Sequence, residues 1–356
     1  MFDELLEINK QNFEDVIHSQ KKMLGAIDTL AHLELPKKGV SEKEAVYTSD
    51  KVTLYHYVPK SKKLISPPVL ISYALVNKYY MMDLQEGKSF IGGLLDAGLD
   101  LYLIDWGYPT KDDMYMTMED YILGYLDEAV DYIREESGYD QINLMGICQG
   151  GTFSTIYTSL RPEKIKNLIT LVTPIDFDTD EKLLFKWGPY LDIDSIVDAY
   201  GVVPGDFMNN GFLMLQPVTL TTNKYLDLID SLDDADKMTN FIAMEKWIFD
   251  SPGQAGETIR QFNNDLYRDN KLVKGELMIG DEQVDMKNIQ CPVLHIYAKF
   301  DHQVPNSSSD KMKKYVGSKD FEEHCIETGH IGLFVSGKSQ KIVVPMISDW
   351  VKDHSK

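Results

Sequence analysis

Residues 142–151 read Ile-Asn-Leu-Met-Gly-Ile-Cys-Gln-Gly-Gly, and this stretch decides the fold. Residues 142–145 are a short apolar run of the kind that forms a buried strand. Gly146, Cys148 and Gly150 then spell Gly-x-Cys-x-Gly, a pattern typical of a nucleophile on a sharp turn between a strand and a helix. The backbone of such a nucleophile is strained, so the residues two positions before and after it must be small.

A helix is expected directly after this turn. Residues 152–160 are predicted to form it, and Pro162 marks its end. The positive N-terminal end of the helix would point at Cys148 and favour its thiolate form. The alternative is a glycine-rich turn with a buried, inert cysteine. The strand before the turn and the helix after it favour the nucleophile over this alternative.

The charge and the cysteine content exclude several classes of protein. The chain has 356 residues and a formal charge of −20 at pH 7, which would repel nucleic acid and anionic membranes. It has no run of about eighteen apolar residues that would cross a membrane, and its N-terminus lacks the pattern of a signal peptide. Three unclustered cysteines predict a cytoplasmic protein without a disulfide framework, a structural zinc site or any other metal site.

Strand and helix patterns alternate along most of the chain. Strands are expected at residues 45–58 (two, with a turn), 67–73, 100–105, 142–145, 166–172, 291–298 and 321–326. Helices are expected at residues 83–97, 117–136, 152–160, 307–315 and 339–351. This alternation is typical of an α/β protein with a mostly parallel sheet and helices on both faces. Together with the nucleophile turn, it predicts an α/β-hydrolase fold.

The alternation breaks after residue 174 and resumes near residue 289. Residues 175–288 contain helical pieces, many aspartates and scattered aromatic side chains, with no clear buried strand before residues 276–279. We expect residues 175–288 to be an inserted cap over the active site, and residues 1–174 and 289–356 to form the hydrolase core. Within that core, residues 1–32 have helical apolar spacing and are predicted to form a helical segment on its surface, with a partner-docking helix as the alternative.

A nucleophile needs a base, and the base needs an orienting group. In this fold the order along the chain is nucleophile, acid, histidine. Asp301 follows the strand expected at residues 291–298, and His330 lies in a loop between glycines after the strand expected at residues 321–326. Sheets of this kind build their sites at the carboxyl ends of the strands. We therefore expect Cys148 to be the nucleophile, His330 the general base and Asp301 its orienter.

Other residues compete for these roles. His302 is the main rival for the base and otherwise has a secondary role near the pocket, and Asp176, which also follows a strand, is the rival acid. Cys291 and Cys325 fall in strand patterns and are expected to be inert. Acyl transfer further needs backbone donors for the oxyanion: Gln149 supplies one, and Val76, in the loop after residues 69–73, is expected to supply the second.

At this point the residues resemble a known family. The sequence Gly146-Ile147-Cys148-Gln149-Gly150-Gly151 looks like the modified lipase box of polyhydroxyalkanoate synthases. The similarity extends through separate motifs in the right order, at residues 73–78, 103–109, 245–250, 301–302 and 329–332. It covers the chain from about residue 40 to the end, and the chain length resembles the catalytic subunit of the two-component, class III synthases.

The resemblance implies an activity and a set of partners. The enzyme would polymerise (R)-3-hydroxyacyl-CoA into polyester, with release of CoA through a covalent Cys148 thioester and without a cofactor. It implies a second synthase subunit, of the PhaE type in class III or the PhaR type in class IV, a homodimer, and a place at the surface of polyester granules in the cytoplasm. Short monomers such as 3-hydroxybutyryl are expected.

Three other functions stay open from the residues alone. A hydrolase with a cysteine nucleophile would use the same three residues but admit water. Another CoA-dependent acyltransferase would use an acceptor that is not a polymer. A catalytically silent scaffold on a granule would lack a member of the triad, and all three members are present in this sequence.

Overall fold

The computed structural model describes residues 38–224, 232 and 234–355. The helical segment predicted at residues 1–32 lies outside the described residues. No helix in the described part of the chain is long and apolar enough to cross a membrane.

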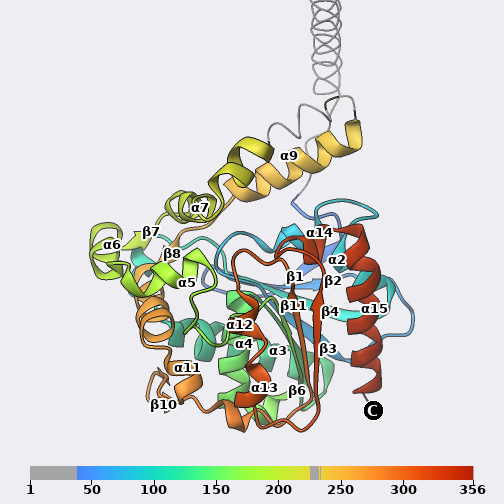
Figure 1. Ribbon diagram of the computed structural model, residues 1–356. Coiled ribbons are helices and arrows are strands. Elements are labelled where there is room, and N and C mark those ends of the chain that lie inside the picture. The colour runs from blue at the N-terminus through green and yellow to red at the C-terminus, as the bar shows by residue number, and fades with distance from the viewer. Residues whose placement is uncertain (1–37, 225–231, 233, 356) are drawn as a thin grey trace, which may run out of the picture.

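An eight-stranded sheet forms the centre of the protein (Figure 1), in the order β1-β2-β4-β3-β5-β6-β11-β12. β2 pairs antiparallel with β1 and with β4, and all the other pairs are parallel. The parallel strands therefore present their carboxyl ends at one edge, as the alternating pattern predicts. The strands are β1 (Lys43–Ser49), β2 (Val52–Tyr57), β3 (Ile65–Ser72), β4 (Leu99–Asp105), β5 (Ile142–Ile147), β6 (Ile165–Leu171), β11 (Val293–Ala298) and β12 (Phe321–Ile326).

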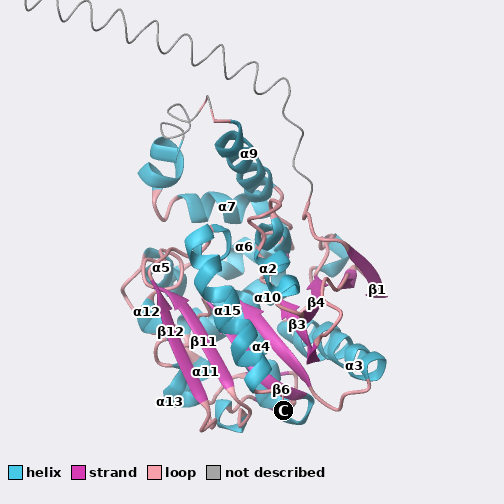
Figure 2. Ribbon diagram, turned by 90° about the vertical axis from the view of Figure 1, so that its right-hand side faces the viewer, coloured by secondary structure: helices cyan, strands magenta, loops and turns pink. Residues whose placement is uncertain are grey.

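Helices cover both faces of the sheet (Figures 1 and 2), because its buried strands carry apolar side chains on both sides. On one face, Val69 and Ile71 of β3 share an apolar cluster with α2 (Phe90–Asp96) and α15 (Gly337–Asp353). On the other face, Leu70 clusters with α3 (Leu126–Ser137) and α4 (Gln149–Leu160). This two-faced burial is the α/β-hydrolase architecture expected from the sequence.

Between β6 and β11, no described residue joins the main sheet. Residues 175–288 are called the insertion below. Its described residues form helices and two small two-stranded sheets, and α7 and α9 lie beyond the core in Figure 1. The helices are α5 (Leu183–Trp187), η5 (Gly188–Tyr190), α6 (Ile193–Tyr200), α7 (Gly205–Leu213), η6 (Val218–Asn223), α9 (Ala235–Phe249), α10 (Gly256–Gln261), η7 (Phe262–Arg268), α11 (Lys271–Lys274) and η8 (Met286–Asn288). The small sheets pair β7 (Val202–Val203) with β8 (Gln254–Ala255) and β9 (Met278–Ile279) with β10 (Glu282–Gln283).

Some expected helices differ in extent from those observed. The helix predicted at residues 83–97 was wrong at its start, because α2 begins only after Ser89, whose hydroxyl accepts from the Gly92 N–H at 2.7 Å. Ahead of it, η1 (Tyr79–Asp83) is a short 3₁₀ turn. The helix predicted at residues 307–315 is split into α12 (Asn306–Ser309) and α13 (Met312–Tyr315).

Two further helical segments complete the core. The helix predicted at residues 117–136 contains a π-helical stretch, η3 (Asp120–Tyr125), directly before α3. A short helix, α14 (Gly332–Val335), precedes α15. Single 3₁₀ turns, η2 (Lys111–Asp113) and η4 (Pro162–Lys164), lie in connections between elements.

The packing at Gly150 makes a first prediction. A Cβ atom there would lie 2.2 Å from the Ser72 carbonyl oxygen at the end of β3, a distance that no side chain tolerates. Gly150→Ala is therefore expected to lower the melting temperature sharply or to prevent folding. Gly124→Ala is the matched control, since a Cβ there meets nothing within 4 Å, and it should be neutral or slightly stabilising. Equal melting temperatures for Gly150→Ala and the wild type would contradict the packing.

Candidate active site

Cys148 lies at the turn between β5 and α4. Its backbone has φ 54° and ψ −124°, a conformation that a residue with a side chain rarely adopts. The Cys148 N–H donates to the Leu171 carbonyl of the neighbouring strand at 2.9 Å, and the Cys148 carbonyl accepts from the Gly151 N–H at 2.9 Å. A Cβ on Gly146 would lie 2.5 Å from the Gly151 Cα, so a larger residue there would push α4 off the strand.

His330 and Asp301 form a buried pair. The two loops that carry them follow β12 and β11, and backbone bonds join these loops. The Lys299 N–H donates to the Ile326 carbonyl at 2.8 Å, and the Phe300 N–H donates to the Thr328 carbonyl at 2.9 Å. With the loops held together, His330 Nδ1 lies 2.6 Å from Asp301 Oδ2.

The Asp301 carboxylate is fixed from two sides. Its Oδ1 accepts from the N–H groups of Gln303 and Val304, at 2.8 and 2.9 Å, while Oδ2 faces His330. Both side chains of the pair are almost fully buried, 5% exposed for His330 and 2% for Asp301. A carboxylate held this way orients the imidazole through Nδ1 and leaves Nε2 for another partner.

Charge at the site acts on the pKa of His330. Burial alone would lower this pKa, but the negative charges of Asp301 and Cys148, and hydrogen bonds to both, raise it above its ordinary value. The imidazole therefore holds its proton through neutral pH when it faces both groups. This arrangement stabilises the imidazolium form of His330.

Two backbone donors are left open beside the nucleophile. The Gln149 side-chain oxygen accepts from the Leu75 N–H at 3.1 Å, which ties the loop after β3 to the start of α4. Among the described residues, no hydrogen bond uses the backbone N–H of Gln149 or of Val76. Cys148, Gln149 and Val76 all line one cavity, so both expected oxyanion donors border the nucleophile's pocket.

The rival acid makes different contacts. Asp176 is bound by Lys311 Nζ at 3.0 Å, the Tyr315 hydroxyl at 3.1 Å and Asn270 Nδ2 at 2.8 Å. Burial would raise the pKa of the Asp176 carboxyl, but its hydrogen bonds to Asn270 and Lys311 lower it. The structure thus places Asp176 in a separate polar cluster, and Asp301 against His330.

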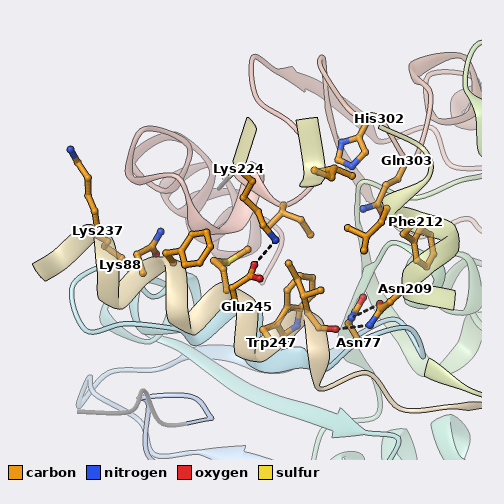
Figure 3. A pocket seen from close by; sticks show the side chains of 17 residues that line it. Asn77, Lys88, Asn209, Phe212, Lys224, Lys237, Glu245, Trp247, His302 and Gln303 are labelled. Carbon is orange, nitrogen blue, oxygen red and sulfur yellow. Dashed lines mark hydrogen bonds and ion pairs between the residues drawn. The ribbon is translucent and has the colours of Figure 1, made fainter. Parts of the chain in front are cut away.

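The rival histidine, His302, directly follows Asp301 in the chain, and its side chain makes no hydrogen bond within the described residues. Burial lowers the pKa of His302, and the nearby charge of His330 lowers it further against the opposing effect of Asp301. His302 faces the hollow drawn in Figure 3. His295, expected in the core, is buried there with Nδ1 2.6 Å from the Thr170 hydroxyl, and burial lowers its pKa to about 4.

The other two cysteines lie away from this cavity. Burial raises the pKa of the Cys291 thiol to about 12. The pKa of Cys325 is also raised, first by burial. Both therefore stay thiols at neutral pH, which makes them poor nucleophiles.

Cys148 and His330 line an apolar cavity of about 560 Å³. The insertion supplies much of its wall, including Trp187, Phe207 and Trp247, which are among the scattered aromatic residues of the segment that we expected to cover the active site. Tyr267 also lines it, and we did not single it out from the sequence. The feature of the sequence that could have indicated Tyr267 is the aromatic content of residues 175–288.

A second hollow, of about 550 Å³, adjoins the first (Figure 3). The two share Asn77, Phe212, Trp247, Gln303 and Ile331. Its rim carries Lys88, Lys224 and Lys237, and Lys224 pairs with Glu245. No cluster of three or more histidine, cysteine or acidic side chains suited to a metal ion occurs within the residues that the structure describes.

Comparison with known families gives two matches. Residues 67–336 match the α/β hydrolase fold. Residues 5–93 match the N-terminus of poly-beta-hydroxybutyrate polymerase (PhaC). The first match spans more than half of the chain.

Similar curated proteins extend over nearly the whole chain. A poly(3-hydroxyalkanoate) polymerase subunit PhaC of Allochromatium vinosum is 48% identical over 96% of this chain and 96% of its own length. A protein of the same name from Synechocystis is 47% identical over 97% of this chain and 93% of its own length.

Solved structures share the fold at low identity. A thermophilic esterase of Thermogutta terrifontis superposes with a TM-score of 0.51 at 15% identity, covering 89% of this chain and 100% of the esterase. A monoacylglycerol lipase of Paleococcus ferrophilus gives 0.50 at 17% identity, covering 82% of this chain and 96% of the lipase. The likeness supports the α/β-hydrolase fold.

Two buried aspartates provide a matched test of the His330 pair. Asp301→Asn removes the charge that raises the pKa of His330, so iodoacetamide should modify Cys148 about tenfold more slowly at neutral pH. Asp176→Asn should leave that rate unchanged and lower the free energy of unfolding by about 1–3 kcal/mol, because its charged hydrogen bonds are weakened. Peptide mapping of the alkylated cysteine measures the rate. Slow alkylation of Cys148 in Asp176→Asn, together with a normal rate in Asp301→Asn, would show that Asp176 and not Asp301 acts on His330.

Proposed function

The chain belongs to the PhaC family of poly(3-hydroxyalkanoate) polymerases, and from this premise we propose how its active site makes polyester. The protein is thus an acyltransferase on an α/β-hydrolase fold. We assign Cys148 as nucleophile, His330 as general base and Asp301 as its orienter, acting on (R)-3-hydroxyacyl-CoA. The observation that carries this proposal is the buried His330–Asp301 pair beside a strained cysteine in an apolar cavity.

The first step acylates the enzyme. The Cys148 thiolate attacks the carbonyl carbon of the acyl-CoA thioester, and the bond to the CoA sulfur breaks. The leaving thiolate takes the proton of the His330 imidazolium and departs as CoA–SH. One thioester replaces another, so the step is nearly balanced, and His330 is left neutral.

The second step extends the chain. His330, now neutral, removes the proton from the 3-hydroxyl of another acyl unit while that oxygen attacks the Cys148 thioester. The carbon–sulfur bond breaks, and the thiolate–imidazolium pair is restored. An oxoester replaces a thioester, which makes this step downhill, and a positioned base contributes about a hundredfold to ten-thousandfold to its rate.

In each step a tetrahedral intermediate carries negative charge on oxygen. The free N–H groups of Gln149 and Val76 are the donors that we assign to it. Preorganised donors of this kind stabilise the transition state more than the ground state, and losing one costs about a hundredfold to a thousandfold in rate.

The insertion acts as a cap that keeps water from the acyl-enzyme. Hydrolysis of the Cys148 thioester would end chain growth, so the site must favour a hydroxyacyl group over water. The apolar and aromatic wall that the insertion contributes supports this role. We propose short monomers such as 3-hydroxybutyryl, as the resemblance to class III subunits implies.

One thiol per chain suffices for this chemistry. The raised pKa values of Cys291 and Cys325 leave Cys148 as the reactive cysteine. The acyl chain then stays on Cys148 or leaves it between additions, without a second thiol in the same chain.

The proposal extends to partners and place. The relatives are named as polymerase subunits, and this supports a two-component synthase of class III with a PhaE-type second subunit. We propose a homodimeric catalytic subunit at the surface of a cytoplasmic polyester granule, without a cofactor beyond the CoA of its substrate. A PhaR-type partner is the alternative outcome.

Incubation with (R)-3-hydroxybutyryl-CoA, with and without a PhaE-type subunit, tests the activity. Wild-type protein should release CoA and deposit insoluble polyester, faster with the partner. Cys148→Ala should release no CoA, and His330→Gln should lose both acylation and elongation. Free 3-hydroxybutyrate in place of polymer would establish a hydrolase and contradict the proposal, as would sustained turnover by Cys148→Ala.

A further inference from the structure

The loop between β3 and η1 lies between the core and the insertion. It spans residues 73–78 and carries Val76, one of the two open backbone donors at the active site. Asn77, the next residue, has φ 62°, in the left-handed region that asparagine tolerates better than most side chains. The position of the Val76 N–H therefore depends on what holds this loop.

The core holds the first part of the loop. Trp106 Nε1 donates to the Tyr73 carbonyl at 2.8 Å, and the Leu75 N–H donates to the Gln149 side chain. These bonds fix the chain before Val76. At the far end of the loop, the Lys78 ammonium is paired with Asp105 of β4.

The insertion holds the part of the loop after Val76. Trp247, near the end of α9, donates its indole N–H to the Lys78 carbonyl at 2.6 Å. The Asn77 amide donates to the Ser251 hydroxyl and to Asn209 Oδ1. Figure 3 shows Asn77, Asn209 and Trp247 together at the floor of the second hollow.

The same end of α9 is anchored to the core by a carboxylate. Asp250 accepts from the hydroxyls of Tyr80 and Tyr108, each at 2.7 Å, and pairs with Lys38. The three donors hold the pKa of the Asp250 carboxyl below its usual range against the opposing effect of burial. These contacts give the end of α9 one defined position on the core, directly beside the loop of residues 73–78.

We propose that Trp247 is a positioning residue for the oxyanion donor Val76. Trp247 holds the Lys78 carbonyl, and Asn209 and Ser251 hold the Asn77 amide. Together these hydrogen bonds fix the backbone that follows Val76 and so the position of the Val76 N–H. The N–H groups of Gln149 and Val76 can then both reach the oxyanion only when the end of α9 is packed against the core, which is what we call the seated insertion. This inference rests on the proposed function, because it assigns a role to the insertion within that same reaction.

The arrangement has a chemical consequence. A seated insertion both covers the cavity and completes the oxyanion site, so acylation proceeds only when water is excluded. An unseated insertion exposes the thiolate but leaves it with one donor. Coupling the two events protects the acyl-enzyme from hydrolysis.

A Trp→Phe pair tests this assignment. Trp247→Phe removes the indole N–H and keeps an apolar ring. Trp350→Phe is the matched control, because Trp350 in α15 is equally buried, 5% exposed, and its indole N–H has no hydrogen-bond partner within the described residues. Steady-state CoA release from (R)-3-hydroxybutyryl-CoA, with the second subunit present, gives kcat and KM for each variant.

Trp247→Phe should lower kcat about tenfold to a hundredfold with KM unchanged, because a donor displaced by a fraction of an ångström stabilises the transition state less. Trp350→Phe should keep the wild-type kcat and KM. A Trp247→Phe enzyme with the kcat of the control, or with a raised KM alone, would overturn the inference. Loss of CoA release by the wild type itself would instead count against the proposed function.

A second variant keeps the test open if Trp247→Phe does not fold. Asn77→Gly retains the left-handed backbone and loses the amide bonds to Ser251 and Asn209. It should lower kcat in the same direction with KM unchanged. A normal kcat in Asn77→Gly would show that the insertion does not position the donor.

Discussion

The strained backbone of Cys148 is the constraint on which the rest of the site depends. A residue with a side chain at φ 54° is unfavourable, and it persists because β5, α4 and the bond to Leu171 hold it in place. The same turn lifts the sulfur to the carboxyl edge of the sheet and directs the first N–H of α4 beside it. Val76, Asp301 and His330 reach the same edge in loops that follow other strands of the sheet, β3, β11 and β12.

The two buried carboxylates near the site, Asp301 and Asp176, differ in their hydrogen-bond partners. One oxygen of Asp301 accepts from two backbone N–H groups, and the other faces His330. The oxygens of Asp176 instead accept from Lys311, Tyr315 and Asn270. A buried imidazole without Asp301 would prefer to be neutral. The pair is therefore an electrostatic device, in which the carboxylate stabilises the imidazolium that a thiolate requires.

The core could be predicted from the sequence, because glycine spacing and alternating apolar runs are local signals. Cys148, Asp301 and His330 follow strand ends that the pattern marks, and the structure brings these three together. The start of α2 was missed, since Ser89 caps the helix later than the apolar spacing indicates. The contacts of Trp247 and Asn77 could not be foreseen, because they join residues 169 and 174 positions apart and depend on how the insertion seats on the core.

The central claim is that Cys148 carries the acyl chain, and trapping that species tests it most directly. Butyryl-CoA lacks the 3-hydroxyl, so an acyl group transferred from it cannot be extended. After acid quenching, intact-mass measurement and peptide mapping should find one butyryl group per chain, on the peptide that contains Cys148. An adduct on Cys291 or Cys325, or CoA release without any adduct on the wild-type chain, would contradict the account.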